Sequence, residues 1–411
     1  MKAGSDKQPS KGVDCNLKIL MINHFPISGS GSGTYTRNIA VHLMKKGHEV
    51  SVVLPENTMQ YSGIPGADMY PVFFSHDEPV GGSLPFNFPC FTTHPRSTTS
   101  FFDLDDSQIE AYLSAFEKTI NEAVAKFKPD VIHAQHIWLL AWLAKKTGVP
   151  YVITAHGTDL MGFQKSSRFR KYATEAAEGA KRIITISNDN DELVRQLFPS
   201  CADSTLFMRN GYDPERFYPE ELTQAQVLAR YVIKPLDRLV LFSGKLAHFK
   251  GVDVLLDAAR LYEGERPGKI ITVLAGDGEL AMQLKKQAED YALKNVHFLG
   301  FLDVSQLRCL YSVADVSVAP SRREPFGLVA VEALACGSTV VATNEGGLPD
   351  IINDDVGALV DVDDAFGLST AIQRELYRPD RAERRKHAAK YALEKYAQDH
   401  MIDLLIDIFK T

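Results

Sequence analysis

The chain has 411 residues, 45% of them hydrophobic, which is enough material for two domains of ordinary size. A formal net charge of -7 disfavours a nucleic-acid binder whose affinity depends on a broadly basic surface. The five cysteines are scattered, which is typical of a reducing compartment and of a protein without a cysteine metal site. No apolar run is long enough to span a bilayer, and residues 1–16 lack the apolar core of a signal peptide. We therefore expect a disordered leader and a cytoplasmic protein.

The first predicted element is a buried strand over residues 17–23, followed by the glycine-rich loop SGSGSG and a helical pattern over 34–46. A strand, a glycine loop and a helix start allow backbone N–H groups to approach a phosphate. The loop does not fit the dinucleotide fingerprint, because Thr34 stands where its third glycine belongs, and it lacks the lysine of a P-loop. A nicotinamide enzyme is therefore disfavoured. A plain turn between strand and helix is the alternative.

Residues 59–106 lose periodicity and are rich in proline, glycine and aromatic residues. Loops of this length in a compact domain are usually functional or disordered. The aromatic residues favour a packed loop on the acceptor side, with His94 and Arg96 as its candidate contacts. The alternative is that both side chains are merely solvated.

A predicted helix at 106–128 precedes two predicted strands, at 130–134 and 150–154. Ligands bind at the carboxyl ends of parallel strands, so the residues that follow these strands are substrate candidates, although a histidine is more often structural. They are Gln135, His136, His156 and Thr158.

A basic cluster follows, formed by Lys165, Arg168, Arg170 and Lys171. It either holds an anionic acceptor or coats a helix, and the sequence leaves both open. Asn188 and Asp191 then form a box-like helix cap. The spacing of Asp189 and Asp191 suggests a metal site, but acidic residues also suit a first helical turn, so we predict no metal.

The second half repeats the alternation of strand and helix after a predicted boundary at residues 210 and 211. Its first strand, at 238–244, is followed by Lys245 and by Lys250, which precedes a helix. A lysine at a helix N-terminus is unfavourable unless an anion is bound there. The two lysines would stabilise a departing diphosphate and remove the need for a metal. Ordinary surface lysines are the alternative.

Residues 319–347, APSRREPFGLVAVEALACGSTVVATNEGG, carry two glutamates. Glu324 precedes a proline, so we expect an extended backbone there and a helix that begins at Pro325. Residues 326–335 are apolar or glycine except Glu332, which predicts a buried helix with one carboxylate. A sugar diol would satisfy such a carboxylate, and the free N–H groups near Gly327, Leu328 and Val329 suit a diphosphate. The alternatives are a capping role for Glu324 and an arginine partner for Glu332.

Further on, Asp303 and Gln306 form a predicted capping box. The tail from residue 380 is helical in pattern. Its apolar stripe must pack on another element. The stripe consists of Met401, Leu404, Leu405, Ile408 and Phe409.

The combination of SGSGSG, HAQH, AHGTDL, RNGYDPERF, SGKLAHFKGVDVLL, AGDGEL, FLGFL, EPFGLVAVEA and TNEGGLPDII resembles the retaining nucleotide-sugar glycosyltransferases of family 4. The resemblance covers nearly the whole chain after Asn16. It implies an α/β protein of the GT-B fold, in which two Rossmann-like, doubly wound domains face each other across a cleft. Residues 17–210 would form the acceptor side and 211–390 the nucleotide-sugar side, with a helix at 391–411 packing back on the first domain.

The resemblance also implies roles for single residues. Lys245 and Lys250 would hold the diphosphate, Glu324 the sugar hydroxyls and Glu332 the ribose, while His156 corresponds to the active-site histidine near the sugar. The backbone of Phe301 and Leu302 would read the base. Further donor contacts are expected from Gly31, Ser32, Gly33, Asn210, Phe326, Gly327, Leu328 and Val329. The acceptor is expected to meet His94, Arg96, Gln135, His136 and Thr158.

Two positions depart from the family pattern. Lys245 stands where an arginine is usual, which replaces a bidentate fork by a point charge. Gln135 stands where many members have the second histidine of HxH, so that role falls to His136 or is lost. The stretch AHGTDL also resembles the synthases that join N-acetylglucosamine to malate, but six residues do not identify an acceptor.

The resemblance implies transfer of a sugar from a nucleotide-diphosphate sugar, most simply a UDP-sugar, to a hydroxyl, with an alpha linkage and with neither metal nor cofactor. The acceptor would be a small polar or anionic molecule, or a free or lipid-linked glycan. Membrane contact through residues 165–171 and the oligomeric state stay open. The alternatives are a nucleotide-sugar epimerase or hydrolase of the same fold and a non-catalytic binding subunit.

Overall fold

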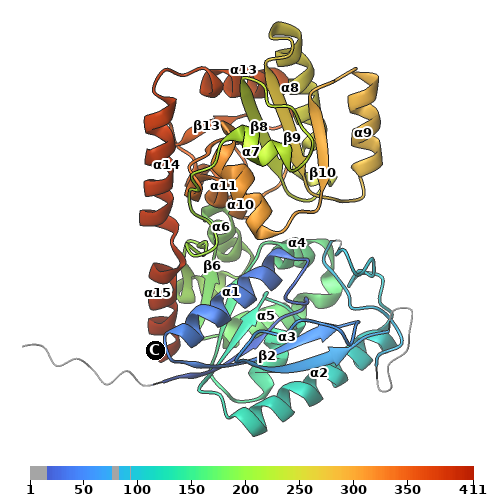
Figure 1. Ribbon diagram of the computed structural model, residues 1–411. Helices are drawn as coiled ribbons and strands as arrows, with labels where there is room; N and C mark the ends of the chain where they lie inside the picture. Colours follow the sequence, from blue (N-terminus) through green and yellow to red (C-terminus); the bar gives the residue numbers. More distant parts are fainter. Residues whose placement is uncertain (1–15, 76–82, 93) are drawn as a thin grey trace, which may run out of the picture.

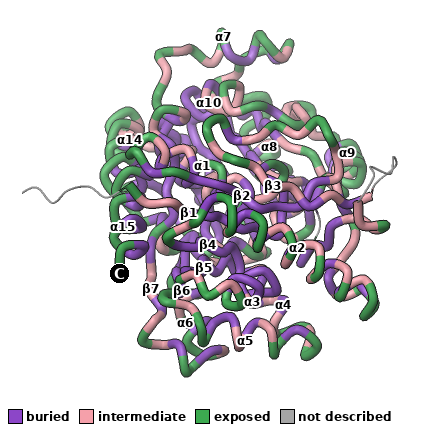
Figure 2. Tube along the Cα trace, turned by 90° about the horizontal axis from the view of Figure 1, so that it is seen from below, coloured by how far each residue is buried: buried purple, intermediate pink, exposed green. Residues whose placement is uncertain are grey.

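The computed structural model describes residues 16–75, 83–92 and 94–411. Residues 1–15 of the predicted leader, and Cys15 with them, lie outside the described residues. Figure 1 shows two halves, one above the other, each built on its own sheet with helices on both faces. The two predicted parallel sheets are therefore confirmed. In Figure 2 the strands form the buried interior, and helices such as α9 and α14 expose one side to solvent.

Among the described residues, the first sheet has seven strands in the order β3-β2-β1-β4-β5-β6-β7, with all neighbouring strands parallel. Chain order reverses between β1 and β4, and the loops that follow these two strands flank the switch point where open α/β sheets bind ligands. The strands are β1 (Lys18–Ile22), β2 (Glu49–Glu56), β3 (Asp68–Phe73), β4 (Val131–Gln135), β5 (Tyr151–Ala155), β6 (Arg182–Thr185) and β7 (Thr205–Phe207).

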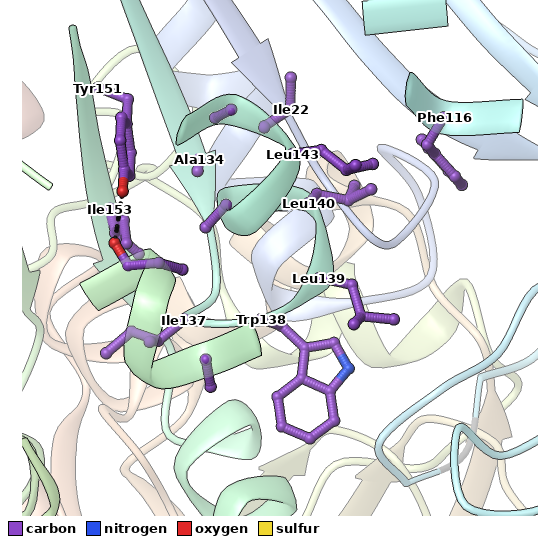
Figure 3. Packing of buried hydrophobic residues seen from close by; sticks show 14 of the residues in the cluster. Ile22, Phe116, Ala134, Ile137, Trp138, Leu139, Leu140, Leu143, Tyr151 and Ile153 are labelled. Atoms are coloured by element: carbon purple, nitrogen blue, oxygen red, sulfur yellow. Dashed lines mark hydrogen bonds between the residues drawn. The ribbon is translucent and has the colours of Figure 1, made fainter. Parts of the chain in front are cut away.

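Helices cover both faces of this sheet because its strands are apolar on both faces. Figure 3 shows Leu140 and Leu143 of α3 near Ile22 and Ala134, which come from the central strands; all four are in one buried cluster. The helices of this half are α1 (Gly31–Lys45), α2 (Asp106–Phe127), α3 (Leu139–Lys146), α4 (Thr158–Lys165), α5 (Arg170–Gly179) and α6 (Asn188–Leu197).

The second sheet has six parallel strands in the order β10-β9-β8-β11-β12-β13, with its switch point between β8 and β11. Its strands are β8 (Arg238–Ser243), β9 (Ile270–Ala275), β10 (Val296–Gly300), β11 (Val316–Ala319), β12 (Thr339–Thr343) and β13 (Gly357–Val360). Its helices are α7 (Gln224–Ala229), α8 (Val252–Glu265), α9 (Ala281–Asp290), α10 (Val304–Val313), α11 (Leu328–Ala335), α12 (Leu348–Ile351) and α13 (Ala365–Leu376).

The last two helices connect the halves. α14 (Arg381–Tyr396) packs on α11 in the second half, whereas α15 (Gln398–Lys410) lies beside α1 in the first (Figure 1). Between them the chain crosses back beside Tyr212, whose N–H donates to the carbonyl of Tyr396 at 2.9 Å. The prediction that Leu404 belongs to the packed stripe of α15 was wrong, because 43% of its surface is exposed. The other four residues of the stripe are buried in the core around β1 and α1.

This difference gives a matched pair of variants. We expect Leu405→Ala to lower the free energy of unfolding by about 2–5 kcal/mol, since Leu405 is fully buried against the first half. Leu404→Ala, one residue away on the exposed side, is expected to change it by about 0.5 kcal/mol or less. Urea unfolding of both variants tests the docking of α15, and an equal loss in both would contradict it.

Several predicted helix ends shift for local reasons. α1 begins at Gly31 instead of Thr34, since Ser30 caps it by accepting from the N–H of Gly33 at 3.0 Å. α11 begins at Leu328 instead of Pro325, because Gly327 has a left-handed φ of 107°. The cap of α6 is Ser187, not Asn188, and it accepts from the N–H of Asn190. The capping box of Asp303 and Gln306 is confirmed.

Candidate active site

The two halves meet where α4 and α6 lie (Figure 1). The contact is close: a Cβ atom placed on Gly157, which caps α4, would lie 3.3 Å from Cβ of Pro325. Nearby, the carboxylate of Asp350 accepts from the backbone N–H of Asn188 at 3.0 Å. The structure therefore brings the loop after β5 next to the loop that carries Glu324, and the start of α6, after β6, next to α12.

The glycine loop is held in a shape that leaves its tip accessible. A Cβ atom on Gly33 would lie 2.1 Å from the carbonyl oxygen of Pro26, so only glycine fits there, whereas a Cβ on Gly31 would meet no atom within 4 Å. Asn23 at the end of β1 ties down the helix start by donating to the carbonyl of Ser32 at 3.1 Å. Among the described residues, the buried Ser32 hydroxyl has no hydrogen-bond partner. This loop fits the predicted phosphate contact.

The predicted acceptor residues His94 and Arg96 hold the long loop in place. Buried His94 donates from Nε2 to the carbonyl of Ser28 in the glycine loop at 3.1 Å, and Arg96 Nη1 lies 2.8 Å from a carboxylate oxygen of buried Glu56. Burial lowers the pKa of His94 to about 4. Neither side chain is merely solvated, as the alternative had it. A direct acceptor contact by either one stays a prediction.

Two buried, uncharged histidines, His136 and His156, lie together at the strand tips of the first half, and we call them the histidine floor. His156 donates from Nε2 to Oε1 of Gln135 at 2.9 Å, and the His136 ring lies 4.8 Å from the His156 ring between centroids. Burial lowers the pKa of His156 to about 3 and that of His136 well below its ordinary value. Uncharged imidazoles at this position suit hydroxyl groups better than anions.

Gln135 is therefore the hydrogen-bond partner of His156, while the His136 ring is tilted by 49° against the His156 ring and its backbone has a strained positive φ of 82°. Two residues outside the predicted site also lie here: Asp159, which the sequence places at a strand tip without a role, and His24, which sequence reasoning missed. Asp159 braces both strand tips by accepting from the N–H of Ile137 at 2.7 Å, and His24 follows β1 with Nδ1 2.7 Å from the Tyr112 hydroxyl. The signal for both was their place within four residues of the end of a strand of the sheet.

The second half contributes the charged groups. Lys250 ends a short 3-10 turn, His248–Lys250, instead of starting the helix as predicted, and its Nζ lies 2.5 Å from Oε2 of Glu324. Glu324 is 7% exposed and does not cap α11, whose cap residue Gly327 receives no side-chain bond. Lys245 Nζ lies 3.2 Å from Glu279. Two groups predicted to hold the donor thus form a buried ion pair.

Glu332 lies on the second turn of α11, half-buried, and burial raises its pKa from 4.5 to about 8. The charge of Arg216 lowers it only in part, and among the described residues no cation lies within ion-pair distance of Glu332. The predicted arginine partner is therefore absent from that part of the chain. Once it is ionised, above a pKa of about 8, Glu332 can accept from two hydroxyl groups.

The other predicted donor residues divide into accessible and buried positions. Phe301, directly after β10, exposes 84% of its surface, while Leu302 beside it is buried. Leu328 and Val329 are half-buried at the first turn of α11. Phe326 is buried with its ring 6.4 Å from that of Tyr396, and the side-chain oxygen of buried Asn210 accepts from the N–H of Gly211. Side-chain contacts by the last two with a donor stay predictions.

The comparisons with known proteins match this layout. A family model described as Glycosyltransferase Family 4 matches residues 29–216, and one described as Glycosyl transferases group 1 matches residues 226–395. The D-inositol 3-phosphate glycosyltransferase of Saccharomonospora viridis is 30% identical over 341 residues, which cover 75% of this chain and 77% of that protein. The chain belongs to glycosyltransferase family 4.

Solved structures show the same fold for this glycosyltransferase. Sucrose-phosphate synthase from Thermosynechococcus elongatus superposes with a TM-score of 0.75 at 20% identity, over 96% of this chain and 98% of that one. Anabaena HepE, solved with UDP and glucose, gives a TM-score of 0.73 at 19% identity, over 96% and 100% of the two chains. The predicted GT-B fold is confirmed.

Two further observations concern the described part of the glycosyltransferase. It contains no group of three or more His, Cys, Asp or Glu residues that could hold a metal ion. Asp191, of the D-x-D spacing, instead accepts from the Thr185 hydroxyl at 2.9 Å and pairs with Arg195 at 2.6 Å. None of its described helices is long and apolar enough to cross a membrane.

The pKa of Glu332 gives a prediction for nucleotide binding. Ribose hydroxyls donate best to the ionised carboxylate, so the affinity for UDP should rise as pH increases towards 8, by up to about tenfold per unit. Protein stability changes in the opposite direction. The Glu332 carboxyl has a pKa of 4.5 in the unfolded chain and about 8 in the folded protein, so the folded state holds the proton more tightly. The contribution of Glu332 to stability therefore falls as pH rises from 4.5 to about 8. Calorimetry between pH 6 and 9 tests the first effect. Equal pH dependence in Glu332→Gln would exclude Glu332 as its source.

Proposed function

We propose that this glycosyltransferase moves a sugar from a UDP-sugar to an acceptor hydroxyl with retention of configuration, forming an alpha linkage without a metal ion or a cofactor. The observation that supports this most is the buried pair of Lys250 and Glu324 at the switch point of the second sheet. A bound donor would replace this internal pair by two external ones, diphosphate on Lys250 and sugar hydroxyls on Glu324.

The chemistry follows from these groups. The acceptor oxygen attacks the anomeric carbon on the face that the nucleotide leaves, the bond from that carbon to the phosphate oxygen breaks, and the acceptor proton passes to the departing diphosphate. Lys245 and Lys250 would stabilise the negative charge that remains on the diphosphate, which is the role a metal has elsewhere. Neutral His156, with its tautomer fixed by Gln135, would contact sugar hydroxyls.

UDP is the first nucleotide to test, because Anabaena HepE, which shares the fold, was solved with UDP and with UDP-glucose. The Saccharomonospora viridis relative is named for D-inositol 3-phosphate, a phosphorylated polyol. Polyhydroxylated molecules are therefore the first acceptors to test. An epimerase or hydrolase would consume the donor with no acceptor present. A binding subunit would bind the nucleotide and transfer nothing.

Calorimetric binding of UDP, GDP and ADP to the wild type, to Glu332→Ala and to Lys250→Ala tests the donor site. We expect tight binding of UDP alone, weakened at least fivefold by both substitutions and unchanged by Lys269→Ala, which alters an exposed lysine paired with Asp237. Binding of GDP or ADP in preference to UDP would refute the proposed nucleotide. Equal binding by the site variants would refute the proposed site.

A further inference from the structure

A cavity of about 630 Å³ lies beside the proposed reaction centre, within the size range of small-molecule sites. Its walls include Phe91, Phe102 and Met161, and its charged lining residues are Lys165 and Arg323. Neither the donor-site groups nor the histidine floor form part of this lining. It is therefore a separate compartment whose occupant the proposed donor site does not explain.

The cavity is placed to present a hydroxyl to the reaction centre. Arg323 adjoins Glu324 in the chain, and Met161 lies on α4, the helix that begins just after His156. The Phe91 ring lies 5.2 Å from that of His136 between centroids, so the apolar wall continues into the histidine floor. One half of the protein supplies Lys165 and the other Arg323, and the cavity is complete only when the halves face each other.

The lining of the cavity carries positive charge. Both charged lining residues are cations, and no carboxylate lines the cavity within the part of the chain that the structure describes. The other arginines of the basic cluster are already engaged: Arg168 pairs with Asp106, and Arg170 donates to the carbonyl of Phe163 at 3.0 Å. Lys165 instead lies over the Phe102 ring at 4.2 Å, and among the described residues no carboxylate lies within ion-pair distance of it.

The positive charge of Arg323 is balanced only in part by a nearby carboxylate, that of Glu345. Arg323 lowers the pKa of Glu345 through its charge, but burial and the charge of Asp189 outweigh it and leave that pKa raised. Within the described residues no carboxylate forms an ion pair with Arg323. Its neighbour Arg322, by contrast, is held by Asp253 and Asp363, both at 2.6 Å. Two cations from different halves thus line one cavity, and no carboxylate of residues 16–75, 83–92 or 94–411 pairs with either of them.

We propose that this cavity binds the acceptor and that the acceptor carries a phosphate or carboxylate group, which Lys165 and Arg323 hold from opposite halves. This inference rests on the proposed transfer reaction and deepens it. The apolar face of the acceptor packs on Phe91 and Phe102, and a hydroxyl points towards His156 and the donor sugar. Two cations on one anion give charge-assisted hydrogen bonds, which are about twice as strong as neutral ones.

The test compares matched probes on the UDP-loaded enzyme by calorimetry: glucose 6-phosphate and glucuronate against glucose, and inositol 1-phosphate against inositol. At least one anionic probe should bind at least tenfold more tightly than its neutral partner. Lys165→Ala and Arg323→Ala should each remove most of that preference, and Lys165→Arg should retain it. Lys171→Ala removes an exposed charge that does not line the cavity and should change it less than twofold.

UDP affinity, measured first on the same samples, separates the two proposals. Normal UDP binding with no preference for any anionic probe would overturn the anionic acceptor and leave the donor site intact. An equal preference in Lys165→Ala and the wild type would place the anion elsewhere and overturn the assignment. If the wild type does not bind UDP at all, the proposed function itself is refuted.

Discussion

Replacing Lys250 with alanine is expected to lower kcat for sugar transfer by about 10²–10³-fold, the cost of removing one charge-stabilising group from a transition state. Lys250 lies 2.5 Å from Glu324 at the head of α8, where a departing diphosphate would develop its charge. The measurement is the rate of UDP release at saturating donor and acceptor. A properly folded variant with unchanged kcat would mean that Lys250 does not act on the diphosphate.

The same variant should also lose stability without ligand. Removal of Lys250 leaves the buried Glu324 carboxylate unpaired, and we expect a loss of about 3 kcal/mol, at the lower end for a buried pair because the Lys250 side chain keeps 17% exposure. The double variant Lys250→Ala/Glu324→Gln removes the unpaired charge. It should recover most of the stability and none of the transfer, which separates the two effects.

Gly346→Ala is expected to have the second largest effect, although the residue bears no functional group. Gly346 has a left-handed φ of 57°, and a Cβ atom there would lie 2.0 Å from the carbonyl oxygen of Glu324. The backbone of Glu324 must move to accommodate it, and a displacement of about 1 Å in a site of this kind costs about 100-fold in rate. We expect both a lower melting temperature and a loss of transfer of that size.

The control for this variant is Gly264→Ala. Gly264 lies in α8, and a Cβ atom on it would meet no atom within 4 Å. Alanine there should stabilise the helix by about 0.5–1 kcal/mol and leave transfer unchanged. If Gly346→Ala behaves like this control, the close approach between the two loops does not position Glu324.

The architecture could be predicted from the sequence because alternating strands and helices leave few arrangements of a parallel sheet. The same reasoning found the residues at the strand tips, since the carboxyl ends of parallel strands meet at one edge. His156 and Gln135 are an example: they are 21 residues apart in the chain, and their side chains are hydrogen-bonded. The family resemblance added the distinction between donor and acceptor sides.

Pairings between distant residues could not be predicted. Nothing in the sequence near Lys250 indicates that Glu324, 74 residues later, is its partner. Arg96 was considered either an acceptor contact or solvated, yet it pairs with Glu56, because the long loop folds back onto β2. The start of α11 depended on the left-handed backbone of Gly327, which a glycine permits but does not require.

Retention of configuration without a metal ion can be measured in a single reaction. UDP-glucose labelled with ¹³C at the anomeric carbon is incubated with the enzyme, the probe that binds most tightly in the cavity, and EDTA, and the product is followed by NMR from the first turnover. We expect a labelled alpha-glycoside that forms in step with UDP, at a rate that EDTA does not lower. A beta-glycoside, or label released as free glucose at the same rate without acceptor, would contradict the proposed function.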